Sequence, residues 1–418
     1  MLRLIRRIIP QPLFRALQPS YHRVLALMAA VRYGFPASGL TVIGITGTNG
    51  KSTTVEMIHA IFLAAGIPVA SLSSVRLKFG EREEPNPFKM TMPGRFFIQK
   101  FLHEAKKRGM RFVVLEVTSE GIKQFRHRYI PFAAAVLTNL TPEHIESHGG
   151  FENYKRAKGE LFRALQGRGV SVINGGDPSA PYFISFPAQK TLTYRLEGEA
   201  TLVPARYEIT KDGITLEFSE GIISSPLKGR FNAENMLAAI TVGEAFGVSF
   251  DAIKTALSHF TGVPGRMEEI KAKNFRVIVD YAFTPNALRQ VYQTLKPEAR
   301  HLICVLGGTG GGRDKWKRPE LGKIAAELCD RVIITNEDPY EEEPRAIMND
   351  VARGAPQAEI IEDRGEAIQK ALKLAGEGDV IIITGKGSEQ TMAVRGGRQI
   401  PWDDRATVRK ALETLKEI

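Results

Sequence analysis

The chain has 418 residues, of which 43% are apolar and 25% are charged, as in an ordinary globular protein with two or three domains. Its net charge of +11 suits polyanionic substrates, an anionic membrane surface or nucleic acid, and nucleic acid is least favoured because no binding motif for it occurs. Only Cys304 and Cys329 are present, which argues against a disulfide framework and for a reducing compartment, and no apolar run approaches the roughly 20 residues of a membrane-spanning helix.

Residues 1–39 form a basic segment without any acidic residue, and apolar side chains lie between its arginines. These arginines are Arg3, Arg6, Arg7, Arg15, Arg23 and Arg32. A basic amphipathic segment of this kind can lie on an anionic membrane surface. A helix that packs against the next domain, with its arginines in solvent, is an equally good interpretation. A secretory signal is less favoured, because Pro10 and Pro12 break the first apolar stretch.

Residues 40–53 are the stretch with the clearest function. A β-branched apolar run leads into three glycines spaced three apart, then into Lys51, Ser52 and Thr53, and then into a helical pattern. Glycines let backbone N–H groups turn toward an anion, and the helix N-terminus adds the positive end of its dipole. We therefore predict a phosphate-binding loop in which Lys51 reaches the outer phosphates and a Ser52 or Thr53 hydroxyl binds magnesium. A tight turn without a ligand is the weaker alternative, since it requires neither the lysine nor three glycines.

Strand and helix patterns alternate after this loop. The next helix carries apolar residues on one face and is predicted to end at Gly66. Residues 112–117 and 135–138 are almost continuously apolar, which is typical of buried parallel strands. Residues 207–210 and 214–218 alternate about a Lys-Asp-Gly turn, which predicts an antiparallel hairpin.

A second alternation begins near residue 263. Short apolar strands are predicted at residues 277–279, 302–306, 332–335 and 380–384, with helices between them. Ligands of a doubly wound unit bind at the carboxyl ends of such strands. We therefore predict an α/β fold in three parts: the basic segment 1–39, a central phosphate-loop domain 40–262 whose mostly parallel sheet has an antiparallel part, and a Rossmann-like domain 263–418.

Polar residues near the strand ends are candidates for chemistry. Glu116 ends a buried strand, where a carboxylate is costly unless it is paired or binds a metal. Together with Ser52 or Thr53, Glu116 and His144 would offer ligands for Mg²⁺, although His144 could also be a hydrogen-bonded loop histidine. Residues 307–315 hold five glycines beside cations, which indicates close approach of an anionic ligand, with a flexible surface loop as the alternative.

Residues 46–53 resemble the ATP loop of the Mur ligases and of the related folylpolyglutamate synthases. Nine further motifs follow in the order found in the MurE type, the UDP-N-acetylmuramoyl-tripeptide synthetases that add the third residue of the peptidoglycan stem peptide. They lie at residues 116–119, 138–149, 154–158, 232–235, 264–268, 280–282, 313–319, 385–389 and 403–405. The resemblance covers residues 40–418.

The resemblance implies an ATP- and Mg²⁺-dependent, ADP-forming amide ligase that activates a carboxylate as an acyl phosphate before an amine attacks it. By the match, Lys51, Lys158 and His144 are catalytic, and magnesium is held by Ser52, Glu116, His144 and a carbamylated Lys158. The implied nucleotide-binding residues are Gly47, Thr48, Asn49, Gly50, Lys51, Ser52, Thr53, Asn232, Asn235, Arg266 and Asp280. The implied substrate-binding residues are Thr118, Ser119, Arg313, Asp338, Tyr340, Gly385 and Glu389.

Two departures from the family pattern bear on the substrates. The family's N-terminal domain, which holds the uridine nucleotide, is replaced here by the basic segment, so the acceptor could be UDP-linked or lipid-linked. Members that add diaminopimelate have Asp-Asn-Pro-Arg where this chain has Glu337-Asp338-Pro339-Tyr340. Losing that arginine removes a partner for a distal carboxylate, and Asp338 adds negative charge, so we expect lysine or ornithine rather than diaminopimelate.

The resulting hypothesis is a cytoplasmic monomer that joins a diamino acid to a muramoyl-L-Ala-D-Glu precursor, binds no nucleic acid, and touches the membrane peripherally through residues 1–36. One alternative keeps the chemistry but changes the acceptor to a lipid-linked precursor or, as in the folylpolyglutamate synthases, to a folate. An alternative of another class is a catalytically silent, ATP-binding scaffold.

Overall fold

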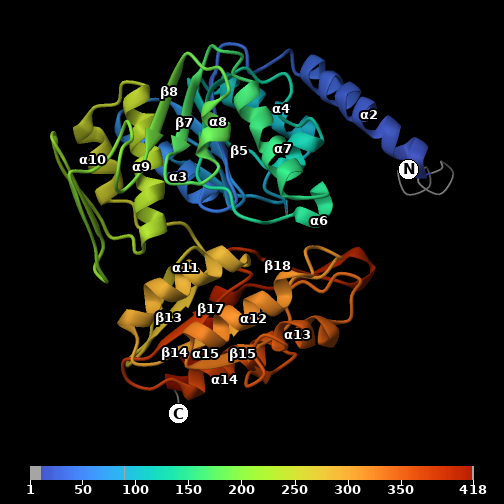
Figure 1. Ribbon diagram of the computed structural model, residues 1–418, viewed down its shortest axis with the longest axis vertical. Helices are drawn as coiled ribbons and strands as arrows, with labels where there is room; N and C mark the ends of the chain where they lie inside the picture. The colour runs from blue at the N-terminus through green and yellow to red at the C-terminus, as the bar shows by residue number, and fades with distance from the viewer. Residues whose placement is uncertain (1–10, 89, 417–418) are drawn as a thin grey trace.

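The computed structural model describes residues 11–88 and 90–416, which form two α/β units, one above the other in Figure 1. The sheet of the first unit has the strand order β4-β3-β2-β5-β1-β6-β7-β8. Six of its strands are parallel, and β3 and β4 continue one edge as antiparallel strands. The strands are β1 (Thr41–Thr46), β2 (Val69–Leu72), β3 (Arg76–Phe79), β4 (Arg82–Pro85), β5 (Phe112–Glu116), β6 (Phe132–Leu137), β7 (Val170–Asn174) and β8 (Lys190–Tyr194).

Helices cover both faces of this sheet because its central strands are apolar on both sides. One face packs against α3 (Lys51–Ala64), α9 (Arg230–Ala245) and α10 (Phe250–Ser258). The other packs against α4 (Arg95–Lys107), α7 (Phe151–Arg163) and α8 (Ala180–Ile184), with the short α5 (Ser119–Lys123) and α6 (Ile145–His148) nearby. Gly44 of β1 faces α7, and a Cβ there would lie 2.8 Å from Leu161 Cδ1, so the glycine permits close helix–strand packing.

The predicted hairpin is confirmed and has a third strand. β9 (Arg206–Ile209), β10 (Ile214–Phe218) and β11 (Gly221–Ser225) form an antiparallel sheet beside α10. Ile214 and Leu216 of β10 point into the core that α3 and α9 also line. This sheet is the antiparallel part expected from the sequence.

The second unit is built on a sheet with the order β12-β13-β17-β14-β15-β16, in which only β12 is antiparallel. Its strands are β12 (Glu268–Lys271), β13 (Arg276–Val279), β14 (Leu302–Leu306), β15 (Arg331–Ile334), β16 (Glu359–Ile360) and β17 (Val380–Ile383). β13, β14, β15 and β17 are the four predicted strands, each within one residue at either end. A short ribbon of β18 (Thr391–Val394) and β19 (Arg398–Pro401), with the 3-10 turn η2 (Arg395–Gly397) between them, stands beside the sheet.

Helices again cover both faces. α11 (Pro285–Leu295), which ends in the 3-10 turn η1 (Lys296–Glu298), lies with α12 (Lys317–Leu328) and α13 (Pro344–Ala352) on one face, and α14 (Arg364–Leu374) with α15 (Asp404–Lys416) on the other. Residue 280 follows β13, residue 307 follows β14 and residue 385 follows β17, so these loops share the carboxyl edge of the sheet. That edge faces the phosphate-loop edge of the first unit, since Thr284 Oγ1 donates to Asn49 Oδ1 at 3.3 Å. The α/β fold class is therefore confirmed.

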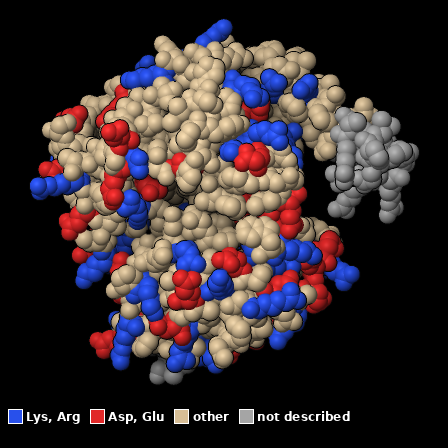
Figure 2. Space-filling view, viewed as in Figure 1, with Lys and Arg blue, Asp and Glu red and all other residues tan. Residues whose placement is uncertain are grey.

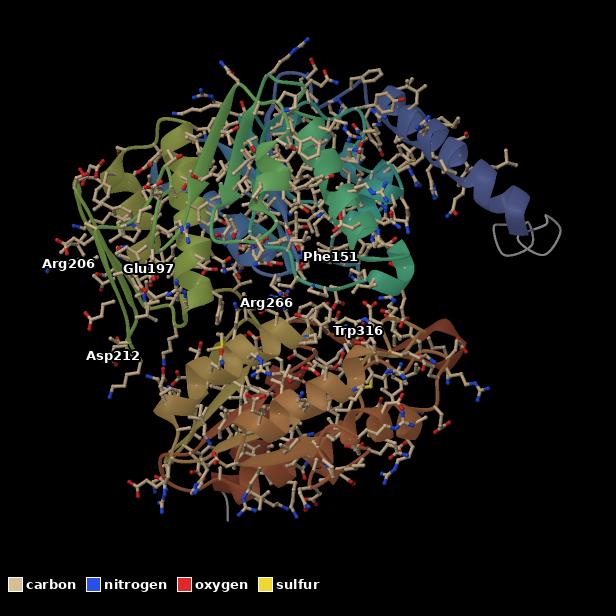
Figure 3. The ribbon with its side chains drawn as sticks, in the orientation of Figure 1. Phe151, Glu197, Arg206, Asp212, Arg266 and Trp316 are labelled. Carbon is tan, nitrogen blue, oxygen red and sulfur yellow. A yellow bond between two sulfur atoms is a disulfide. The ribbon has the colours of Figure 1, made fainter. Side chains whose placement is uncertain are left out.

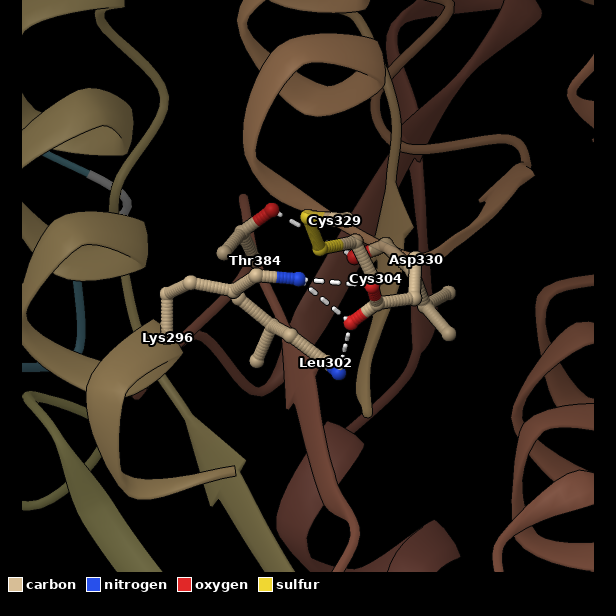
Figure 4. The surroundings of a disulfide bond; sticks show 7 residues. Lys296, Leu302, Cys304, Cys329, Asp330 and Thr384 are labelled. Carbon is tan, nitrogen blue, oxygen red and sulfur yellow. Dashed lines mark hydrogen bonds and ion pairs between the residues drawn. A yellow bond between two sulfur atoms is a disulfide. The ribbon is translucent and has the colours of Figure 1, made fainter. Parts of the chain in front are cut away.

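The two cysteines form a disulfide, although the sequence argued against a disulfide framework. Cys304 lies in β14 and Cys329 directly follows α12, and their Cα atoms are 6.2 Å apart (Figure 4). The bond lies between Thr384 and the ion pair of Lys296 with Asp330. Packing of α12 against β14 brings the pair together, and a sequence separation of 25 gave no sign of it.

Removing this bond is expected to lower stability. The Cys304→Ser/Cys329→Ser variant should lose about 3 kcal/mol of unfolding free energy, since the bond restricts the unfolded chain. Urea denaturation of both proteins with and without dithiothreitol tests this. The wild-type curve should shift to lower urea on reduction while the variant's stays, and coincident wild-type curves would contradict the prediction.

Candidate active site between the two units

The phosphate loop joins β1 to α3 and has no room for side chains at two of its glycines. Gly47 and Gly50 have φ of 151° and 81°. A Cβ on Gly47 would lie 1.9 Å from Thr138 Oγ1, and one on Gly50 would lie 2.3 Å from Asn235 Oδ1. The loop therefore needs glycine for its close contacts and, at Gly50, for its left-handed backbone. Its shape fits a phosphate, because the N-terminus of α3 follows immediately.

Lys51 folds back over this loop. Its Nζ donates to Gly47 O at 3.1 Å and to Thr48 O at 2.9 Å, and lies 4.0 Å from Glu116 Oε1. Burial lowers the pKa of Lys51, and the Glu116 carboxylate opposes part of that shift. The ammonium is thus held at the mouth of the loop, where an anionic phosphate would be a better partner than two carbonyls.

Glu116 is the buried carboxylate at the end of β5, and one of its oxygens accepts two hydrogen bonds. Ser52 Oγ and the Ser74 backbone N–H both donate to its Oε2 at 2.8 Å. Arg266, from the second unit, donates to Ser74 Oγ at 3.3 Å and lies over the Tyr281 ring at 4.0 Å. Figure 3 labels Arg266 at the junction of the two units. A hydroxyl beside a carboxylate next to a phosphate loop is a suitable donor set for Mg²⁺.

Lys158 reaches the same loop from α7. Its Nζ donates to Gly47 O at 2.7 Å and lies 4.6 Å from the centre of the Tyr154 ring. Burial, and then the neighbouring Lys51 charge, hold the pKa of Lys158 well below its usual value. Lys51 and Lys158 thus both donate to the Gly47 carbonyl, and the surroundings of Lys158 favour its neutral amine.

His144 lies at the contact between the units, in a left-handed conformation with φ of 54°. Its backbone N–H donates to Asp314 Oδ2 at 2.5 Å, and its Nδ1 lies 4.0 Å from the same oxygen. Burial, followed by the Lys317 charge, lowers the pKa of His144 to about 3, so the imidazole is neutral and able to bind a metal.

Glu143 completes this cluster. Its Oε1 accepts from Lys317 Nζ at 2.9 Å, its Oε2 has no hydrogen-bond partner among the residues described, and burial raises its pKa. Glu143, His144 and Asp314 bring one ligand atom each within 4.8 Å of one another. Sequence reasoning did not identify Glu143 or the Lys317 pair, and the acid next to His144 was the one available signal.

The other residues expected to bind the nucleotide lie in two places. Asn235 Nδ2 donates to Asn232 Oδ1 at 3.3 Å on α9, where both asparagines are buried beside the start of α3. Asp280, just after β13, accepts from the backbone N–H groups of Met267 and Ala282 at 2.7 and 2.6 Å. Burial raises its pKa and the Arg266 charge opposes the shift. Asp280 thereby fixes the loop that carries Arg266.

Thr118 and Ser119 have structural partners. Thr118 caps α5 by accepting from Gly121 N at 3.1 Å, and Ser119 Oγ lies 3.1 Å from His148 Nε2. Both residues follow β5 directly, at the same sheet edge as Glu116. They are therefore placed near the site, with their side chains already hydrogen-bonded.

The expected amino-acid pocket lies at the carboxyl edge of the second sheet. Lys386 Nζ donates to both carboxylate oxygens of Asp338 at 3.0 and 3.1 Å, and contacts Glu389. Asp338 also accepts from Ala393 N at 2.6 Å, so its charge is balanced within the protein. Arg313 lies over the Tyr340 ring at 5.3 Å.

Gly385 belongs to the same edge. It has φ of 105°, and a Cβ there would lie 2.2 Å from Glu337 Oε2. The glycine allows the loop after β17 to approach the loop after β15, and so positions Lys386 against Asp338.

A phosphate loop with two lysines and a buried carboxylate, facing the carboxyl edge of a second α/β unit, defines a nucleotide-dependent ligase of two domains. The sequence matches the Mur ligase middle domain over residues 45–243 and the Mur ligase glutamate ligase domain over residues 265–387. The chain belongs to the Mur ligase family and is an ATP-dependent, ADP-forming ligase.

Named relatives show which branch of the Mur ligase family the chain resembles. The chain is 36% identical over 416 residues to the UDP-N-acetylmuramoyl-L-alanyl-D-glutamate–2,6-diaminopimelate ligase of Thermosynechococcus vestitus, covering 96% of this chain and 82% of the relative. It is 39% identical to the ligase of that name from Gloeobacter violaceus (93% and 80% covered) and 34% identical to the UDP-N-acetylmuramyl-tripeptide synthetase of a Roseiflexus species (97% and 85% covered). These are MurE-type enzymes, as the sequence motifs predicted.

Solved structures of ligases share this fold. A UDP-N-acetylmuramoyl-L-alanyl-D-glutamate–2,6-diaminopimelate ligase superposes with a TM-score of 0.61 at 33% identity, covering 90% of this chain and 79% of that one. MurF from Acinetobacter baumannii gives 0.69 at 19% identity, with 94% and 80% covered, and shares the fold.

Proposed function

We propose that this ligase joins a diamino acid to the D-glutamate carboxylate of a muramoyl-L-Ala-D-Glu precursor, in the cytoplasm and as a monomer. The observation that carries the proposal is the convergence of Lys51, Lys158 and Glu116 on one phosphate loop opposite Arg266. The names of the MurE-type relatives supply the acceptor class.

The side chains suit a reaction in two steps. A substrate carboxylate oxygen attacks the γ-phosphorus of ATP, ADP leaves, and an acyl phosphate forms. The neutral amine of the incoming amino acid then attacks the carbonyl carbon, and the tetrahedral intermediate expels phosphate and loses a proton. Lys51 would neutralise charge on the phosphoryl group during its transfer, and Arg266 would hold the nucleotide from the second unit.

A bound magnesium ion would stabilise the negative charge of the phosphates during transfer. Ser52 and Glu116 fit it at one position, and His144 with Glu143 and Asp314 offers nitrogen and oxygen ligands at the contact between the units. We propose that Lys158 becomes a further ligand by carbamylation: its neutral amine attacks CO₂, a carbamate forms and a proton leaves. The lowered pKa of Lys158 supports this, since an ammonium cannot attack.

For the amino acid, we propose lysine or ornithine. Asp338 adds little net negative charge to the pocket, because Lys386 and the Ala393 backbone N–H balance its carboxylate. The proposal therefore depends on Tyr340, which stands where the family pattern of diaminopimelate-adding members has an arginine and whose ring packs beside Arg313. A phenol cannot form the bidentate pair that a guanidinium gives a distal carboxylate.

A substrate panel tests the proposal. Phosphate release and product mass are measured with ATP, Mg²⁺, UDP-linked muramoyl dipeptide and, in turn, lysine, ornithine and diaminopimelate. We expect turnover with lysine or ornithine to be at least roughly tenfold above that with diaminopimelate. The distal carboxylate of diaminopimelate would lack a bidentate partner here, and one such pair is worth about this factor. Faster turnover with diaminopimelate would refute the amino-acid proposal alone.

Two further acceptors test the function as a whole. Turnover with a folate, or only with a lipid-linked precursor in vesicles, would replace the proposed acceptor. No turnover with any amino acid and acceptor would overturn the function.

A further inference from the structure

Helix α2 (Gln11–Arg32) stands at one corner of the first unit, and its N-terminal end projects from the molecule (Figure 1). It packs against α4 through small side chains, because Ala26, Ala29 and Ala30 are buried. This confirms packing against the next domain, which was one of the two interpretations of the segment. Arg3, Arg6 and Arg7 of the same segment lie outside the described residues.

The opposite face of α2 is apolar and uncovered. Val31 is 59% exposed, Val24 57% and Met28 54%. Leu17, Tyr21 and Leu27 are also exposed, and together the six residues recur at helical spacing and form one stripe along the helix. Packing on the protein does not explain the stripe, since the alanines form the face that packs.

Two arginines flank this stripe, and the guanidinium of one, Arg23, lies 4.9 Å from the centre of the Phe125 ring. At 3.6 residues per turn, Arg23 and Arg32 lie on its two sides, and residues 1–39 contain no acid. On the packed side of α2, opposite the stripe, Arg95 lies beside His22, and Arg126 donates to Gln124 and Met92. Neither arginine forms a salt bridge within the part of the chain described. Figure 2 shows Lys and Arg side chains gathered on this side of the first unit.

We propose that α2 is a peripheral membrane anchor, whose exposed stripe enters the outer part of an anionic phospholipid bilayer while the flanking arginines bind lipid phosphates. Within the described residues no helix is long and apolar enough to cross a membrane, so α2 would lie along the surface. With 22 residues it is about 33 Å long.

The arginines beside the stripe favour a phospholipid surface over a second copy of the chain as the partner of α2. In a pair of α2 helices joined along the stripe, Arg23 and Arg32 would face arginines and meet no acid on the partner helix. Helix pairs are ordinarily flanked by charges of both signs. A phospholipid surface offers negative charge along the whole helix.

The experiment is cosedimentation of the full chain with vesicles of phosphatidylcholine, with and without phosphatidylglycerol. We expect binding to the anionic vesicles only, weakening as salt rises. Val24→Glu/Met28→Glu should lower the partition coefficient by roughly tenfold or more, since charge enters the apolar face. The control is Ile222→Glu, a residue 47% exposed on β11, which should bind like the wild type.

Equal binding to neutral vesicles, or full binding by the double variant, would overturn the anchor. So would sedimentation velocity showing a dimer that the double variant abolishes, with no vesicle binding, because the stripe would then be a contact between copies. Ligation of water-soluble substrates should be unchanged in the variant. A failed anchor and a failed ligase function are thus distinguishable.

Discussion

Lys158→Ala is expected to lower kcat by on the order of 10² or more, while the fold and nucleotide binding persist. The proposed carbamate would supply an anionic ligand for magnesium, and loss of one electrostatic group of this kind costs about that much. Lys155→Ala is the matched control, since Lys155 lies on the same helix and its Nζ pairs with Glu152 at 2.8 Å. Steady-state phosphate release, with circular dichroism to check folding, measures the effect.

Two readouts connect the loss to the carbamate rather than to the lysine alone. Protein freed of CO₂ should lose activity and regain it with bicarbonate, and ¹³C-bicarbonate should give a carbamate resonance in the wild type that is absent from Lys158→Ala. Activity should fall with decreasing pH, because protonation of the amine removes the carbamate. Burial lowers the pKa of Lys158, so this fall should lie at lower pH than for a lysine in solvent. An active, CO₂-independent enzyme would contradict the assignment.

The sequence predicted the elements that depend on local pattern. The strand at Leu302–Leu306 was placed to the residue because a fully apolar run of five between polar loops fits a buried parallel strand and little else. The phosphate loop was recognised for a similar reason: Gly47 and Gly50 perform backbone tasks that other residues cannot.

The sequence could not predict contacts between residues that lie far apart along the chain. Lys317 meets Glu143 across 174 positions, and Asp314 meets His144 across 170, because the two sheet edges face each other. Asp338 was expected to add negative charge to the amino-acid pocket, but folding places it against Lys386. Periodicity assigned α2 as amphipathic, but which face packs depended on the small side chains that α4 accepts. These outcomes depend on how elements dock.

Lys51→Ala is expected to lower kcat by on the order of 10³, the largest effect of any single change in this site. Hydrogen bonds to the Gly47 and Thr48 carbonyls at 3.1 and 2.9 Å hold the ammonium over the loop, where it would neutralise charge that develops on the phosphoryl group. Lys100→Ala, an exposed lysine on α4, is the control for loss of one positive charge.

The same variant separates a ligase from an ATP-binding scaffold. In cells depleted of the native protein, Lys51→Ala should fail to restore growth although it accumulates and folds normally, whereas Lys100→Ala should restore it. A scaffold needs the folded surface and not phosphoryl transfer, so growth supported by Lys51→Ala would exclude the ligase role in cells. Ser52, which donates to Glu116 at 2.8 Å, would help to bind magnesium and ATP in either role, so growth is the readout that distinguishes a ligase from a scaffold.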